Sequence, residues 1–175
     1  MIFAMLSHVI IVALIAAAAP AAGLTFTRPE GWQKIPSASA TRVADFSLPR
    51  ASGDLEDAEL VLYYFEGAGG AVDANLQRWL RQIEQPDGMP SRLRARKQTR
   101  KVNGLLVTLL DVSGIYVASM VPGASDHNNK PNFRMRAGVI QTPRGPYYIK
   151  LTGPRKTVAK WARAFDQFVG SLRLE

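Results

Sequence analysis

The chain contains no cysteine, and this absence removes several classes of protein at once. No disulfide framework is available, no thiol can act as a nucleophile, and no lipid can be attached to a cysteine at the end of an export signal. An apolar core must therefore hold the folded part together. About 150 residues after an export signal are enough, since a domain of that size buries roughly 70 per cent of its unfolded surface.

Formal charge is missing from the first 27 residues. Residues 9–22 are apolar and fade into small side chains, and Ala19-Pro20-Ala21 fits the small-x-small pattern of a cleavage site. The usual Lys or Arg before such a core is absent, so an uncleaved anchor stays open as an alternative, because about 20 apolar residues span a bilayer. We predict a signal peptide or N-terminal anchor over residues 1–21 and one exported domain, periplasmic or secreted, over residues 22–175. An uncleaved anchor would keep that domain at the membrane.

Histidine is scarce, since His8 and His127 are the only two. A hydrolase of the Ser-His-Asp kind would have to be built on His127, with Asp126 as its neighbour. No G-x-S-x-G motif is present, and His127 lies in a polar loop over residues 122–132 that contains Pro and Gly. The sequence therefore favours a solvated loop histidine over a catalytic or metal-binding one, and we expect no enzyme activity.

Three glycines in four positions, at residues 67–70, separate an apolar run from a helical pattern, as in many phosphate-binding turns. A Walker A loop needs Lys-Ser/Thr after its last glycine, but Ala71 and Val72 follow Gly70. A dinucleotide fingerprint that starts at Gly67 would need a third glycine where Val72 stands. We therefore predict a turn from a strand into a helix, whose amides could still take an anion, and no cofactor.

Four carboxylates gather in the polar turn over residues 50–59. They lack the ligand spacing of an EF-hand and the glycine at its sixth position. A loose calcium site is the alternative to a charged, soluble loop that covers the start of the next strand, and we predict no metal. The four residues are Asp54, Glu56, Asp57 and Glu59.

Hydrophobic spacing and turn signals predict a mixed fold. Asn103-Gly104 is the strongest turn signal, because a type I′ hairpin needs positive φ at both central residues. Hairpin connections make the sheet largely antiparallel, and each of two helices has one apolar stripe to bury against it. The fold class is α+β. Strands are expected at 26–32, 42–48, 60–65, 93–102, 105–112 continuing to 120, 133–141 and 147–151, and helices at 72–83 and 155–170.

The order and lengths of these elements resemble the Mog1/PsbP-like α/β/α family. The extended FTRPEGW entry, the early strands, the mid-chain helix, the hairpin-rich second half and the final helix with Trp and Phe carry the resemblance. It spans most of the chain after residue 21. It implies a sheet flanked by helices and an accessory or binding role, as in small secreted bacterial proteins of this kind, and it assigns no functional residue.

The net charge of +8 is divided unevenly along the chain. Residues 1–91 hold 6 basic and 10 acidic side chains, whereas residues 92–175 hold 16 and 4. Residues 92–101 contain six basic residues and no acid. As a strand, this segment would place Arg92, Arg94, Arg96 and Arg100 on one face, and as a helix it would still align three of them.

Arginines in a row suit phosphate or carboxylate groups, which guanidinium binds in a bidentate manner. The alternative is a solvated edge strand, or one neutralised by the acidic first half of the chain. We predict an exported, non-catalytic domain that binds a protein or another envelope component. A binder of anionic lipid headgroups or phosphate polymers through these arginines is the second hypothesis. Nucleic acid is not expected, because the aromatic interleaving of single-strand binders is missing.

Overall fold

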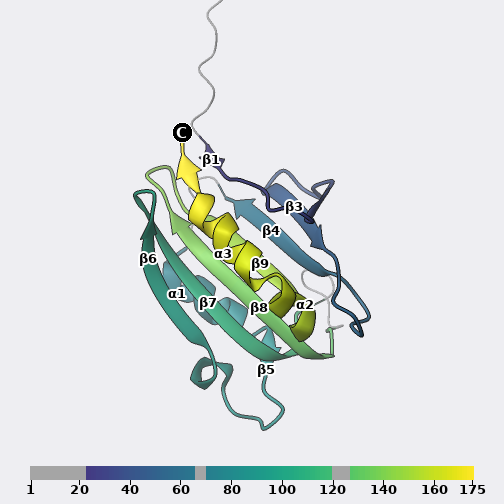
Figure 1. The fold of residues 1–175 in the computed structure, drawn as a ribbon. Coiled ribbons are helices and arrows are strands. Elements are labelled where there is room, and N and C mark those ends of the chain that lie inside the picture. The colour runs from purple at the N-terminus through teal and green to yellow at the C-terminus, as the bar shows by residue number, and fades with distance from the viewer. Residues whose placement is uncertain (1–22, 66–69, 120–126) are drawn as a thin grey trace, which may run out of the picture.

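The computed structural model describes residues 23–65, 70–119 and 127–175. The predicted signal or anchor, residues 67–69 of the glycine turn and Asp126 lie outside these ranges. One eight-stranded sheet forms the centre, and all its strand pairings are antiparallel (Figure 1). In spatial order its strands are β2 (Gln33–Ile35), β3 (Arg42–Leu48), β4 (Ala58–Tyr64), β9 (Tyr147–Pro154), β8 (Lys130–Gln141) and β7 (Leu105–Tyr116), with β5 (Ile83–Glu84) and β6 (Arg96–Val102) both paired to β7.

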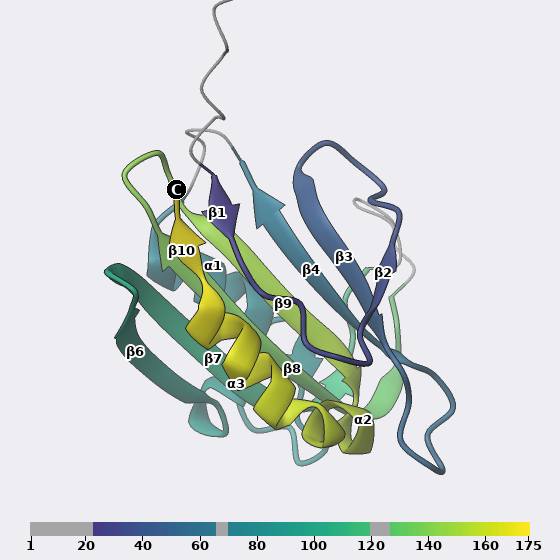
Figure 2. The ribbon, with the colours of Figure 1, turned by 45° about the horizontal axis from the view of Figure 1, so that its top comes forward.

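Helices cover both faces of this sheet (Figures 1 and 2). Helix α1 (Val72–Leu80) lies on one face, and the pair α2 (Arg155–Lys160) and α3 (Ala162–Ser171) lies on the other. A short second sheet joins β1 (Leu24–Thr25) to β10 (Arg173–Leu174), close to the end of α3. The α+β prediction with a largely antiparallel sheet flanked by helices is therefore confirmed.

The alternation along β7 explains why both faces are covered. Leu105, Val107 and Leu109 join the core under α3, whereas Leu110 and Val112 join the core under α1. Successive side chains of a strand point to opposite faces, so a strand that is apolar at nearly every position must be buried on both. The run LLVTLLDV therefore suits the inside of a three-layer structure.

The turn at Asn103 and Gly104 has the predicted geometry, with φ of 48° and 86°. It pairs Val102 with Leu105 and so sets the register of β6 on β7. The Asn103 side chain also donates hydrogen bonds of 3.1 and 2.9 Å to the carbonyls of Gly170 and Leu172. The hairpin is thereby tied to the end of α3, and β6 runs along that helix as an edge strand.

Two sequence predictions fail, one mainly because of local backbone chemistry and one at a contact with a distant residue. Residues 26–32 form no strand, because Pro29 has no N–H to donate, Gly31 adopts a φ of 82°, and Trp32 is buried among aromatic rings. The final helix is not continuous, because the backbone changes direction at Trp161 (φ −95°, ψ 5°). There the Trp161 indole donates a 2.9 Å hydrogen bond to the Pro49 carbonyl.

The predicted helix at 72–83 ends at Leu80, three residues early. Ile83 belongs to β5 instead and pairs with Tyr116 at the end of β7. The Gln82 carbonyl accepts a hydrogen bond from the Val117 amide at 2.9 Å. Pairing with β7 therefore takes over from the helix at this point.

Candidate anion-binding groove

Strand β6 presents basic side chains on both faces of the sheet. Gln98 and Arg100 pair with Leu109 and Val107, which belong to the core under α3. Directly paired residues of antiparallel strands point to the same face, so Arg96, two residues further along β6, also faces the α3 side. Lys97, Thr99 and Lys101 face the α1 side.

Two adjoining hollows lie on the α3 side of β6, β7 and β8. One has a volume of about 630 Å³ and lies between these strands and α3. The other, of about 770 Å³, continues it toward the start of α2. They share Arg96, Asp111 and Arg134. We call them together the arginine groove, after its six arginines: Arg94, Arg96, Arg100, Arg134, Arg136 and Arg155.

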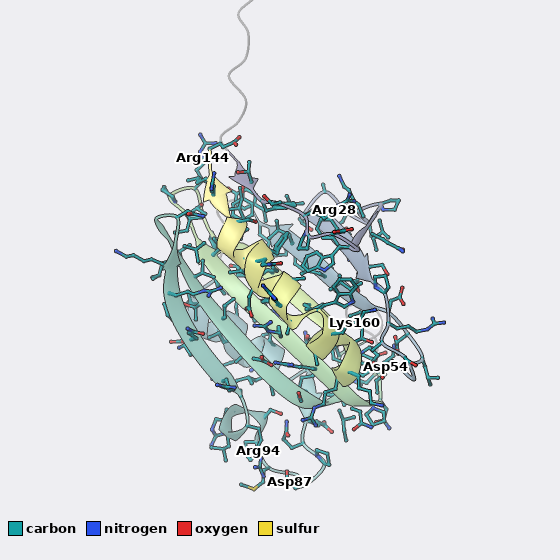
Figure 3. All side chains as sticks on the ribbon, viewed as in Figure 1. Arg28, Asp54, Asp87, Arg94, Arg144 and Lys160 are labelled. Atoms are coloured by element: carbon teal, nitrogen blue, oxygen red, sulfur yellow. The ribbon has the colours of Figure 1, made fainter. Side chains whose placement is uncertain are left out.

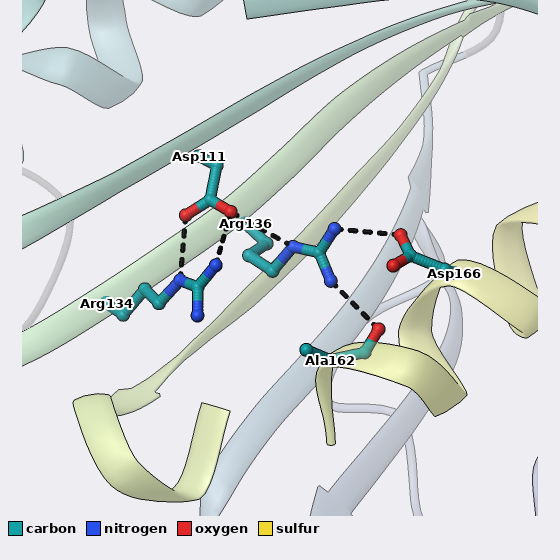
Figure 4. A network of polar contacts seen from close by, with 5 residues as sticks. All are labelled: Asp111, Arg134, Arg136, Ala162 and Asp166. Atoms are coloured by element: carbon teal, nitrogen blue, oxygen red, sulfur yellow. Dashed lines mark hydrogen bonds and ion pairs between the residues drawn. The ribbon is translucent and has the colours of Figure 1, made fainter. Parts of the chain in front are cut away.

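A fixed ion-pair network forms one wall of the arginine groove (Figure 4). Arg134 donates two hydrogen bonds to Asp111, of 2.8 Å from Nε and 2.5 Å from Nη2. Arg136 Nε lies 3.4 Å from the same carboxylate, and its Nη2 and Nη1 donate to Asp166 and to the Ala162 carbonyl at 2.8 and 2.9 Å. The hydrogen bonds that Arg134 donates to Asp111 raise the pKa of Arg134 above its ordinary value. Both guanidinium groups are therefore held in place by carboxylates.

Arginines without acidic partners line the rest of the arginine groove. Among the described residues, Arg96, Arg100 and Arg155 make no ion pair. Nε and Nη2 of Arg100 are excluded from solvent and have no hydrogen-bond partner there. A guanidinium group in this state has lost water without gaining an acceptor. Arg96 and Arg155, together with the part of the partly exposed Arg100 that lines the groove, therefore supply positive charge with which an incoming anion could pair.

The four predicted arginines do not form one stripe, and this corrects the strand prediction for residues 93–102. Strand β6 begins at Arg96, because Pro90 and Ser91 start a short 3₁₀ turn that Ser91 anchors to the Ile83 carbonyl at 2.5 Å. Arg94 forms an exposed pair with Asp87 at 2.8 Å, at one end of the molecule (Figure 3). Arg92 lines hollows beside α1 instead. Arg96 and Arg100 are thus the predicted residues that share a face.

Sequence reasoning missed the arginines that complete the groove. Arg134 and Arg136 lie at alternate positions of the predicted strand 133–141, so one shared face could have been read from their spacing. Their position beside Arg96 could not, because it depends on β7 standing between β6 and β8 with Asp111 paired to both Arg96 and Arg136. Arg155 joins them from the first residue of α2.

The acidic turn does not cover the arginine groove. Asp54 lies beside α2 (Figure 3) and accepts a hydrogen bond from the Thr157 amide, and the other three carboxylates of the turn bind partners outside the groove. Hydrogen bonds from the Arg50 amide and the Ser47 hydroxyl lower the pKa of Asp57. Within the described ranges, no three His, Asp or Glu side chains gather closely enough to hold a metal ion. The pairs are Asp54 with Thr157, Glu56 with Lys130, Asp57 with Ser47 and Arg50, and Glu59 with Arg42.

His127 lies beside a serine, but its orientation does not suit a nucleophile. Nδ1 is 3.2 Å from the Val117 carbonyl oxygen and 3.4 Å from the Ser119 hydroxyl. A carbonyl only accepts, so a hydrogen bond there places the proton on Nδ1, which then cannot take one from Ser119. Among the described residues, no carboxylate is hydrogen-bonded to His127, and Asp126 lies outside them.

Lys150 also lacks a carboxylate partner among the described residues, and it lies on the opposite face of the sheet from the arginine groove. Its Nζ donates to Gln82 Oε1 at 2.9 Å and to the Tyr116 hydroxyl at 3.4 Å, beside a hollow of about 320 Å³. Within the described ranges it has no carboxylate at ion-pair distance. Burial lowers the pKa of Lys150 to about 8, and burial raises the pKa of Tyr116 to about 12.

Lys150 should make stability increase with pH. Between the folded pKa of about 8 and the ordinary 10.5, the unfolded chain holds a proton that the folded chain lacks. The free energy of unfolding should therefore rise by about 2 kcal/mol more from pH 7.5 to 9.5 in the wild type than in Lys150→Met. Urea titrations at both pH values measure this, with Lys34→Met as the exposed control. Equal pH dependence in all three proteins would contradict the assignment to Lys150.

Comparison with known proteins identifies a fold and nothing finer. No protein family model and no curated protein matches the chain. Cyanobacterial PsbP (CyanoP) from Synechocystis sp. PCC 6803 is similar over 94% of this chain and 99% of its own, with 11% identity and a TM-score of 0.50. PA94 from Pseudomonas aeruginosa, a protein of unknown function, matches over 86% of this chain and 96% of its own, with 17% identity and a TM-score of 0.49.

The CyanoP match confirms the architecture that the sequence resembled, a Mog1/PsbP-like sheet flanked by helices. At such identities a shared fold does not carry a shared function. None of the helices in the described ranges has the length and apolar run needed to cross a bilayer.

Proposed function

We propose that this is an exported, non-catalytic accessory protein that binds an anionic component of the cell envelope in the arginine groove. The observation that carries the proposal is the set of groove arginines without acidic partners among the described residues, namely Arg96, Arg100 and Arg155. Guanidinium groups pair with phosphate and carboxylate oxygens through strong charge-assisted hydrogen bonds. The ion-paired wall formed by Arg134 and Arg136 keeps further donors in a defined arrangement.

The exported, accessory character of the proposal comes from other features. The apolar, uncharged first 27 residues favour export. Neither the described surroundings of His127 nor the acidic turn assembles a nucleophile with its base or a metal site. The basic second half of the chain attracts anions and so raises the local concentration of an anionic ligand near the protein. The salt concentration sets the range of this attraction.

Retention on a phosphate-bearing column tests the location of the site. The variant Arg96→Gln/Arg100→Gln should leave phosphocellulose at a clearly lower NaCl concentration than the wild type, because two of the unpaired guanidinium groups are lost. The matched control Arg92→Gln/Lys101→Gln loses the same net charge outside the groove, and should elute close to the wild type. Equal elution of the two variants would show a general charge effect and overturn the proposal. Vesicles containing phosphatidylglycerol, used with the same variants, test lipid headgroups as the anionic component.

A further inference from the structure

The arginine groove is long, and its length limits the ligand. Pairing of Asp111 with both Arg96 and Arg136 places these three residues in one row across the sheet. Arg100 lies four residues from this row in one direction, and Arg134 lies two residues from it in the other, because β6 and β8 run parallel to each other. Six residues of strand correspond to about 20 Å. A single phosphate ion cannot touch both ends.

Within the described ranges, the charged side chains of the groove without an ion-pair partner are Arg96, Arg100 and Arg155, and guanidinium groups only donate hydrogen bonds. The carboxylates of the groove, Asp111 and Asp166, already accept hydrogen bonds from Arg134 and Arg136. A ligand that fits must therefore offer acceptors along its whole length and few donors of its own.

This requirement separates three kinds of polyanion. An extended acidic peptide has backbone N–H groups that need acceptors, but β7 and β8 are each paired with strands on both sides and offer none. The outer edge of β6 is unpaired, but a peptide added there would lie beside the sheet, with β6 and β7 between it and Arg134 on β8. A flat lipid surface presents its charges in a plane, whereas Arg100 lies in a hollow between β6 and α3. A linear phosphate chain carries only acceptor oxygens and can lie along the hollow.

We propose that the arginine groove binds a linear phosphate polymer lengthwise, with one phosphate at Arg100 and others at Arg96 and Arg134. This rests on the proposed function and adds the class of the ligand and its direction in the groove. Each arginine takes one phosphate through the N–H donors that it turns to the groove. The ion pairs between Asp111 and the two arginines Arg134 and Arg136 hold these side chains in place beside the phosphate polymer.

Linear inorganic polyphosphates of graded length test the proposal, with affinities measured by calorimetry at fixed ionic strength. Affinity should rise steeply from orthophosphate through tripolyphosphate to chains longer than 20 Å, and then level off once the groove is filled. With a long chain, Arg100→Gln should lose about tenfold in affinity, and the slope of log affinity against log salt should fall by about 1. Arg92→Gln, which removes the same group outside the groove, should change neither.

Other outcomes decide against the proposal in distinguishable ways. If tripolyphosphate binds as tightly as long chains and Arg100→Gln still weakens it, lengthwise binding is wrong but the anion site of the proposed function stands. If a polyglutamate of matched length, or phosphatidylglycerol vesicles, binds more tightly than polyphosphate, the phosphate class is wrong. If no anion binds, or if Arg92→Gln and Arg100→Gln behave alike, the proposed function fails as well.

Discussion

Replacing Phe168 by alanine should lower the free energy of unfolding by about 3–5 kcal/mol, the cost of emptying a fully buried aromatic site. Phe168 is 0% exposed. Its ring lies 4.9 Å from Phe26, 5.2 Å from Trp32 and 6.2 Å from Phe46, measured between centroids. These partners come from three segments of the chain's beginning, so the ring joins the N-terminal strands to α3.

Urea unfolding followed by tryptophan fluorescence measures this cost. Phe65→Ala is the matched control, because the same atoms are removed from a ring that is 40% exposed. Its loss should be below about 1.5 kcal/mol, since much of that surface already meets water. Similar losses in the two variants would contradict the position of Phe168 at the centre of the core under α3. If Phe168→Ala does not fold, Phe168→Leu should show a smaller loss in the same direction.

Replacing Asp111 by asparagine should weaken folding and strengthen anion binding together. Asp111 neutralises Arg134 and Arg136, whose side chains are 24% and 12% exposed. Removing the partner of such charges costs about 3–5 kcal/mol when they are fully buried, so about 2–3 kcal/mol is expected here. The same change removes a negative charge from the middle of the arginine groove, and affinity for a long polyphosphate should rise about fivefold or more.

The opposite signs make this variant informative. A purely structural network would give the loss of stability without the gain in affinity. The control Asp73→Asn removes an equal charge from an exposed pair with Lys97 on the α1 side, where the side chains are 77% and 52% exposed. It should shift the urea midpoint little, because exposed pairs contribute little, and it should leave polyphosphate affinity close to the wild type. If Asp111→Asn weakens polyphosphate binding, or if Asp73→Asn strengthens it equally, the carboxylate does not act within the binding site.

The parts of the fold that local chemistry determines were predictable. The bounds of β3 agree with the predicted strand, since alternation and Pro49 mark its course and end. The hairpin at Asn103-Gly104 was predicted because few residues other than Asn and Gly accept positive φ. The apolar stripes located both helical regions, which the structure shows as α1 and as the pair α2 and α3.

The parts that distant contacts determine were not predictable. Nothing local to residues 90–95 shows that Ser91 binds the Ile83 carbonyl and delays the start of β6, which removes Arg92 and Arg94 from the strand. The spacing of residues also does not predict the order of the strands in the sheet. That order places Arg134 and Arg136 beside Arg96 on the same face. Of the six arginines of the groove, Arg94, Arg96 and Arg100 were among the predicted residues, whereas Arg134, Arg136 and Arg155 were not.

The most direct measurement of the central claim follows the arginine side chains themselves. In ¹⁵N-labelled protein titrated with a long linear polyphosphate, the Nε–Hε signals of Arg96, Arg100 and Arg134 should shift together and saturate at one equivalent. The signals of Arg92 and Arg42, which lie outside the groove, should stay in place. Shifts spread evenly over all arginines, or confined to those outside the groove, would contradict an anion-binding site in the arginine groove.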